Sequence, residues 1–415
     1  MILKPLCFEA KKAHEEGAVF FDENKNAHVL ISGEEKVIPL EHQYNLVDAT
    51  FFGLNERLTL SSTSPILNQE GKTLRDFFNE EWELYNEALE KSDGRQIDYG
   101  WYTYYPKNND LVLYAPPFWH KVVAVASSSK LLSDDAMKLS WKEIRSVFEQ
   151  TVVGVAGCSV GSTIAHALIM DLRPDHIKLA DKSLYKMENI NRVRLNYKEI
   201  VKNNRERGDS FALPLQNKAQ TVAEQIYGID PFIDIHVYED GIHEQNINQF
   251  FDGAGNEPPI QILVEEVDDP RIKILLRQEA RKRKIPVLMM TDIGSSVQLD
   301  LLRYDQNQNW PLSYGISDEK LIEAMEAVYD NPGNKKIFFE FVDALIGTDY
   351  RTDELQRILE GKSEIPTSTL IPQLGSTASL AGAIAAETIA RMRLGLNYPP
   401  RMLFNKKTFD VKKYF

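Results

Sequence analysis

One stretch, residues 151–192, constrains the fold of this chain more than any other. Residues 152–155 are apolar and predict a short buried strand, and an apolar helix is expected over residues 163–172. A second strand is expected over residues 176–181, and it ends on a carboxylate, Asp181, about 20 positions past the intervening turn. Strand, turn, helix, strand and acid is the order of a nucleotide-binding βαβ unit.

The turn between this first strand and the helix carries almost no side-chain bulk. A phosphate can bind the free N–H groups at a helix start only where the preceding backbone can approach it closely. The turn departs from G-x-G-x-x-G because Ala156 and Cys158 stand at its first two glycine positions. A buried strand-turn-helix without a ligand remains the alternative. The nucleotide hypothesis assigns ribose binding to Asp181 and phosphate approach to four turn residues: Ala156, Gly157, Ser159 and Gly161.

Three later features continue the pattern. The run Asn189-Ile190-Asn191-Arg192 begins eight residues after Asp181, Lys218 opens an expected helix, and Asp268 follows an apolar strand in ILVEEVDD. With these features in this order, the chain resembles the ThiF-type superfamily of adenylyltransferases, which includes the ubiquitin-activating enzymes and the activators of sulfur-carrier proteins. The resemblance covers about residues 100–400.

The resemblance implies ATP-dependent adenylylation of a carboxylate, with ATP and Mg²⁺ as cofactors. It places Asn189, Arg192 and Lys218 at the triphosphate. It places Asp268 at the metal, and magnesium suits such a site because it binds through one or two carboxylates plus substrate oxygens. Arg192, Lys218 and Asp268 are the residues expected to act in catalysis.

Several positions depart from the family's pattern. The family commonly has an arginine that reaches across a dimer interface to the phosphates, but the corresponding residues 125–132 offer only Lys130. Ser183 stands where many members have a second aspartate. The chain has two cysteines, Cys7 and Cys158, and neither is an evident counterpart of the thioester cysteine of ubiquitin-activating enzymes. The chemistry is therefore expected to stop at the acyl-adenylate or to pass directly to an acceptor.

The fold class expected is α/β, with a Rossmann-like, doubly wound, mostly parallel sheet over residues 121–415. Residues 1–120 are expected to form a small N-terminal α+β module whose candidate role is substrate binding. Residues 309–315 are expected to be a strand, and residues 401–411 a closing strand. The small residues within 378–386 should allow close helix packing, which in the family lies near the active site and the dimer interface.

Composition excludes some partners. The net charge of −13 argues against a nucleic-acid backbone as the main partner. No stretch approaches the roughly 18 uninterrupted apolar residues of a membrane helix, so a cytoplasmic protein without a membrane partner is expected. A homodimer is implied by the resemblance alone.

The residues leave the substrate and two other functions open. The activated carboxylate could belong to a peptide, a carrier protein or a small molecule. One alternative function is a catalytically degenerate ThiF-fold scaffold or partner subunit, favoured by the substituted turn and the missing arginine. The other is an NAD- or FAD-binding Rossmann protein, which explains the turn and Asp181 but not Arg192, Lys218 and Asp268.

Overall fold

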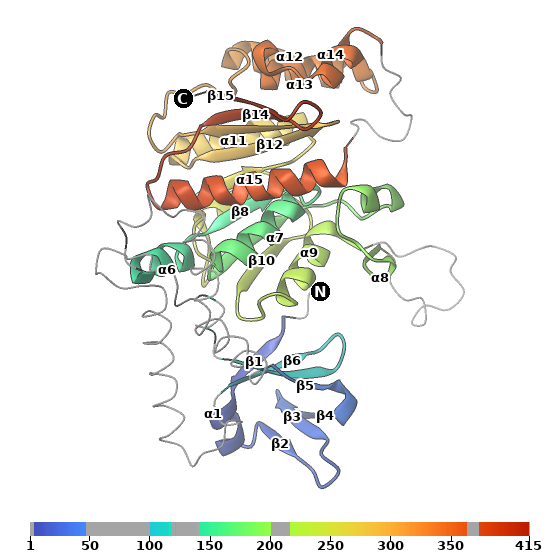
Figure 1. Ribbon diagram of the computed structural model, residues 1–415, viewed down its shortest axis with the longest axis vertical. Helices are drawn as coiled ribbons and strands as arrows, with labels where there is room; N and C mark the ends of the chain where they lie inside the picture. Colours follow the sequence, from blue (N-terminus) through green and yellow to red (C-terminus); the bar gives the residue numbers. More distant parts are fainter. Residues whose placement is uncertain are drawn as a thin grey trace. The chain divides into compact units, whose positions relative to one another are not determined.

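The computed structural model describes residues 4–46, 100–115, 117, 121, 139, 141–200, 216–362 and 373–414. These residues fall into two compact units (Figure 1). The first unit takes the described residues up to 150 together with 169–175 and 224–233, and the second takes 151–168, 176–223 and 234–414. The basic residue discussed above, Lys130, lies outside the described ranges.

The first unit contains two small sheets. One is a three-stranded antiparallel sheet in which apolar residues alternate with polar ones, so that Val19, Ala27, Val29 and Ile38 are buried together. The other has the strand order β1-β6-β7-β5. The elements of this unit are β1 (Leu6–Glu9), α1 (Ala10–Glu15), β2 (Val19–Phe21), β3 (Ala27–Ile31), β4 (Glu34–Ile38), η1 (Leu40–His42), β5 (Gln43–Asn45), β6 (Trp101–Tyr105), β7 (Asp110–Tyr114) and α6 (Trp141–Glu149).

The second unit is built on an eight-stranded sheet with the order β10-β9-β8-β11-β12-β13-β14-β15. The first five strands in this order are parallel, and the last three add antiparallel pairs. The expected α/β class, with a mostly parallel sheet and a C-terminal extension, is therefore confirmed. The strands are β8 (Val153–Ala156), β9 (His176–Ala180), β10 (Asp234–Tyr238), β11 (Ile262–Glu265), β12 (Val287–Ile293), β13 (Ser296–Leu302), β14 (Arg401–Asn405) and β15 (Asp410–Tyr414).

Helices cover both faces of this sheet. On one face, a Cβ on Gly154 of β8 would lie 2.7 Å from the ring of Phe250, and Leu263 of the neighbouring β11 is buried in the same cluster. On the opposite face, a Cβ on Gly161 would lie 2.8 Å from Cγ1 of Val155. The helices and short turns that surround the parallel strands are α7 (Val160–Leu172), η4 (Met187–Asn191), α8 (Tyr197–Ile200), α9 (Lys218–Tyr227), α10 (Ile247–Asp252) and α11 (Pro270–Arg283).

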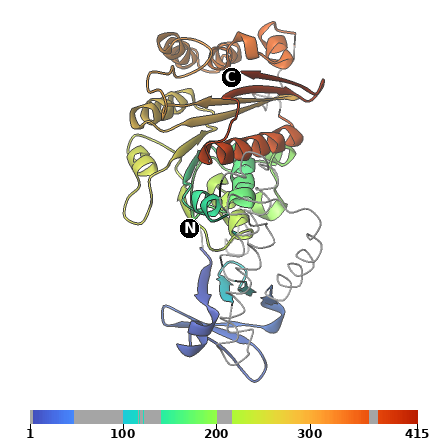
Figure 2. The same ribbon diagram turned by 60° about the vertical axis from the view of Figure 1, so that its left-hand side comes forward.

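The long helix α15 (Gly375–Arg393) lies along α7 in both views (Figures 1 and 2). A Cβ on Gly382 would lie 2.6 Å from the carbonyl oxygen of Thr163, and the Thr163 hydroxyl donates to the carbonyl of Ala378 at 2.8 Å. The small residues therefore do allow close packing, as expected. In another cluster, three helices pack with Ile274 of α11 and Met289 of β12: α12 (Asp318–Asp330), α13 (Lys335–Ile346) and α14 (Asp353–Leu359), with η6 (Thr348–Tyr350) between the last two.

Three local expectations were wrong. The helix after the turn begins at Val160, three residues earlier than expected. Residues 309–315 form no strand, because side chains satisfy their backbone: Leu312 N–H donates to Asp318 and its carbonyl accepts from Arg277, both at 2.7 Å. Residues 401–411 are not one strand but most of a hairpin, β14 and β15, whose turn holds Phe409 at φ +59°. Among the described helices, none is long and apolar enough to span a bilayer.

Candidate functional site

The turn after β8 has room only for glycine at its first bend. Gly157 has φ +96°, a conformation that residues with a side chain rarely adopt. A Cβ there would lie 2.3 Å from the carbonyl oxygen of Glu266. The N–H of Gly157 donates to the carbonyl of Ala180 at 2.8 Å. The N–H of Glu266 donates to the carbonyl of Ala156 at 2.7 Å. The turn is thus held between the carboxyl ends of β9 and β11.

Asp181 fixes this turn from the end of β9. Its Oδ2 accepts from the N–H of Cys158 and its Oδ1 from the N–H of Ser183, each at 2.7 Å. Asn217 donates its side-chain amide to the Asp181 carbonyl at 2.8 Å. A carboxylate oxygen can accept a second hydrogen bond, so these contacts leave capacity for ribose hydroxyls. Ser183 takes part through its backbone, where the family's pattern has a second carboxylate.

The two candidate residues of the 189–192 segment are used differently. Arg192 donates from Nε to the hydroxyl of Ser159 at 3.2 Å, which places its guanidinium at the turn. Asn189 is buried, and its Oδ1 accepts from the N–H of Lys186 at 2.9 Å. Arg192 is therefore available to a ligand at the turn, whereas Asn189 stabilises the short η4 turn that carries the arginine.

Lys218 begins α9, where a cation opposes the helix dipole. Its N–H donates to the carbonyl of Ser183 at 3.0 Å, and its Nζ lies 5.9 Å from the ring centroid of Tyr185. Tyr185 is fully buried and donates to the carbonyl of Cys158 at 3.3 Å. These contacts bring Lys218 to the same turn as Arg192.

Asp268 lies just beyond β11. Burial of its carboxyl among protein atoms raises its pKa, against the opposing charges of Lys273, Lys218 and Arg192, while Asp181 acts in the same direction as burial. The residue nevertheless keeps an exposed surface, so we take the carboxyl to be surrounded on several sides and open on one. Three cations from separate segments, Lys273, Lys218 and Arg192, therefore lie within electrostatic range of this acid.

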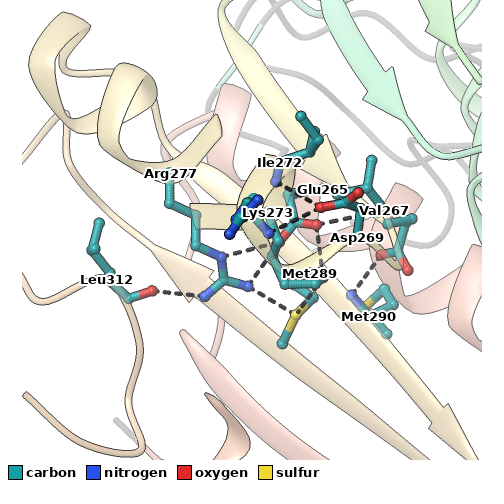
Figure 3. A network of polar contacts seen from close by, with 11 residues as sticks. Glu265, Val267, Asp269, Ile272, Lys273, Arg277, Met289, Met290 and Leu312 are labelled. Carbon is teal, nitrogen blue, oxygen red and sulfur yellow. Dashed lines mark hydrogen bonds and ion pairs between the residues drawn. The ribbon is translucent and has the colours of Figure 1, made fainter. Parts of the chain in front are cut away.

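A buried ion network connects the end of β11 with α11 (Figure 3). Glu265 accepts from Lys273 Nζ at 2.7 Å and from Arg277 Nε and Nη2 at 3.0 and 2.9 Å. Asp269 caps α11 by accepting from the N–H groups of the two residues that follow its proline, at 3.0 and 3.2 Å. The neighbouring acids thus have structural partners: Asp269 caps α11, and Glu265 is the centre of the ion network.

Sequence reasoning missed one acid at this edge of the sheet, Asp292. Asp292 is the penultimate residue of strand β12, is 4% exposed, and accepts from Gln373 Nε2 at 2.7 Å. Burial raises its pKa to about 7, while the Gln373 hydrogen bond and the charge of Arg192 oppose the shift. Burial also raises the pKa of Glu266, which accepts from the N–H of Met290 at 2.7 Å. Asp292 could have been found, because it directly follows the strand expected at 286–291 and carboxyl ends of parallel strands share an edge.

The residues at this edge fit ATP and magnesium. Cations at a glycine turn are typical of phosphate sites, and the open carboxylate of Asp268 could hold magnesium together with phosphate oxygens. Among the described residues there is no group of three or more His, Cys, Asp or Glu side chains that could hold a metal ion. Cys158 is completely buried, and burial raises the pKa of its thiol, so it is a poor nucleophile.

No family model matches the chain. The Mycobacterium tuberculosis protein MT1398, which is uncharacterized, is 30% identical over 164 residues, a match that takes 40% of this chain and 20% of that protein. The chain thus spans only about a fifth of this curated relative.

Three solved structures illustrate the likeness in fold. PaaA has a TM-score of 0.47 at 11% identity, with 85% of this chain and 99% of that chain covered. Escherichia coli MccB has a TM-score of 0.44 at 11% identity over 95% and 91% of the chains. E. coli TcdA, a tRNA N6-threonylcarbamoyladenosine dehydratase in complex with AMP, has a TM-score of 0.44 at 17% identity over 68% and 96%. All three are proteins of the ThiF-type adenylyltransferase fold, the superfamily that the sequence motifs resemble.

Proposed function

We propose that this protein binds ATP with magnesium and transfers the adenylyl group to a carboxylate, releasing pyrophosphate. The observation that carries the proposal is the meeting of Arg192, Lys218 and Asp268 beside a turn at Gly157 that only glycine can make. Two cations and one open carboxylate match the charge pattern of a magnesium-bound triphosphate.

In this reaction a substrate carboxylate oxygen attacks the α-phosphorus while the bond to pyrophosphate breaks. Negative charge builds on the phosphate oxygens, so the protein has to position and neutralise rather than form a covalent intermediate. Arg192, held at the turn by Ser159, and Lys218 supply the positive charge. Asp181 orients the ribose, and Asp268 would hold magnesium, which neutralises the leaving pyrophosphate.

The acyl-adenylate then goes directly to an acceptor. The thiol of Cys158 is buried under the turn and is not suited to take the acyl group. As part of the same proposal, residues 121–415 form the nucleotide-binding domain and residues 1–120 bind the carboxylate substrate, which is a peptide, a carrier protein or a small molecule. The protein is proposed to act as a cytoplasmic homodimer.

Calorimetric titration with ATP and magnesium, beside NAD and FAD, tests this function. We expect ATP to bind selectively. Arg192→Ala and Lys218→Ala should each weaken binding by about tenfold or more, because a hydrogen bond to a charged group contributes about 1.5–3 kcal/mol. Asp268→Ala should remove the dependence on magnesium.

Matched controls are available on α12, where Lys320 and Asp330 are exposed. Lys320→Ala and Asp330→Ala should bind ATP as the unaltered protein does. Preferential NAD or FAD binding would replace the proposal with a redox or cofactor-binding function. Absence of binding to every nucleotide would identify a scaffold that has lost the ligand of its turn.

A further inference from the structure

A cavity of about 580 Å³ lies in the second unit, along the C-terminal part of α15. It is lined by one side of this helix, by β13, by the hairpin of β14 and β15, and by the loop before that hairpin. Its volume is within the range of about 300–1,000 Å³ that is typical of small-molecule sites. The proposed adenylylation site meets the other end of α15, where a Cβ on Gly375 would lie 2.7 Å from the carbonyl oxygen of Asn191. The cavity is therefore a separate site.

The wall of this α15 cavity is mainly aliphatic. Leu299 of β13 and Met402 of β14 are paired in the sheet and line the cavity together, since directly paired residues share a face. Ala383 and Ile384 line it from α15. From Ala383 to Arg391, which also lines the cavity, the helix rises about 12 Å at 1.5 Å per residue. The cavity is thus long enough for an extended alkyl chain.

The polar side chains of the cavity leave one cation without a partner. Arg391 donates from Nε to the carboxylate of Glu387 at 2.6 Å, and the hydroxyl of Thr388 donates to a backbone carbonyl of its own helix at 2.7 Å. Lys413 lies opposite Met402 in the hairpin and is exposed. Within the described part of the chain it has no hydrogen bond or ion pair. Since Glu387 is already paired, the charge that remains at the cavity is positive.

We propose that the α15 cavity binds a free fatty acid of medium chain length. The alkyl chain lies between α15 and the paired Leu299 and Met402, where burial of apolar surface is the driving force. The carboxylate accepts from Nζ of Lys413 and from the N–H groups of Arg391 that Glu387 does not use, because a guanidinium has five donors. The fatty acid is held as a ligand, and no bond is made or broken at this site.

Calorimetric titration of the full chain with hexanoate, octanoate and decanoate tests the proposal, each ligand being kept below its critical micelle concentration. Affinity should rise by up to about fourfold for each further methylene that becomes buried. Decanol and decyltrimethylammonium keep the chain without the negative charge. They should bind about three- to fivefold more weakly than decanoate, which is the effect expected from a partly exposed ion pair.

Two substitutions at the wall locate the site. Lys413→Ala should abolish the preference for decanoate over decanol, whereas Lys407→Ala, at an exposed lysine of the same hairpin, should keep it. Ala383→Phe should fill the cavity and weaken decanoate binding by about tenfold or more, because several methylenes lose their burial. This variant should still fold, since Ala383 is exposed. Arg192→Ala should leave decanoate binding unchanged, which distinguishes this site from the proposed adenylylation site.

Several results would overturn the proposal. Affinity that does not depend on chain length, or equal binding of decanoate and decyltrimethylammonium, would contradict the chemistry assigned to the cavity. Decanoate binding that survives in both Lys413→Ala and Ala383→Phe, or that is lost in Arg192→Ala, would place the fatty acid elsewhere. A dimer that Ala383→Phe dissociates in sedimentation velocity, together with no binding of decanoate, would assign the cavity to a second copy of the chain.

Discussion

Glu265→Gln is expected to destabilise the second unit by about 3–5 kcal/mol, because it leaves two buried cations without their counterion. The carboxylate of Glu265 is completely buried, and Arg277 and Lys273 are 1% and 9% exposed. Three N–H···O contacts of 2.7–3.0 Å would lose their charge at once. The carbonyl of Leu312, which accepts from Arg277 at 2.7 Å, compensates only one of the two cations.

The assay is denaturant unfolding of the full chain. The free energies of unfolding of the variant and the unaltered protein are compared at the same m-value, the slope of that free energy against denaturant concentration. Glu340→Gln is the matched control, since Glu340 is exposed and its ion pair with Lys336 spans 3.8 Å. An exposed pair of this kind contributes at most about 0.5 kcal/mol. Combining Glu265→Gln with Lys273→Met should recover part of the loss, because one unpaired cation is removed with the acid.

A loss for Glu265→Gln no larger than that for Glu340→Gln would refute the reasoning. It would mean that water or a shift of α11 solvates the two cations in the folded state. The result bears on the site as well, because Glu265 anchors the strand end that leads directly to Asp268.

Three further perturbations follow from the same geometry. Gly157→Ala should lower the free energy of unfolding by about 2–6 kcal/mol, because alanine is strained at φ +96° and its Cβ would contact the Glu266 carbonyl. A denaturation midpoint equal to that of the unaltered protein would contradict this prediction. The pKa of Asp292 is raised from 3.8 to about 7, so its proton stabilises the folded state below pH 3.8 and this stabilisation is lost as pH rises through about 7. As pH rises over that range, the free energy of unfolding of the unaltered protein should therefore fall relative to that of Asp292→Asn, by at most about 4 kcal/mol. Parallel pH profiles of the two proteins would exclude the raised pKa. Cys158 is buried and burial raises the pKa of its thiol, so it should resist iodoacetamide in the folded protein and react after denaturation. Mass spectrometry measures the labelling, and rapid labelling of the folded protein would disprove the burial.

Much of the second unit could be read from the sequence, because its pattern is local. Buried parallel strands are apolar runs, and helix starts such as Lys218 and Pro270 are marked by their own residues. One of the three errors arose because distant side chains replaced the expected strand partners. Residues 309–315 have the composition of a strand, yet Arg277 and Asp318 bind their backbone instead of a neighbouring strand.

By itself, the sequence determined the features that depend on residue type at one position. Gly157 predicts a tight turn because only glycine tolerates its backbone angle, and the acids after β9 and β11 predict a polar edge because strand ends in a parallel sheet meet there. Which polar groups become paired was decided only by the tertiary structure. Arg192 binds Ser159, 33 residues away in the sequence, and Gln373 binds Asp292, 81 residues away. No local sequence pattern encodes pairs with such separations. Folding therefore decided that Glu265 pairs with two cations, whereas Oδ2 of Asp292 is buried without a hydrogen-bond partner among the described residues.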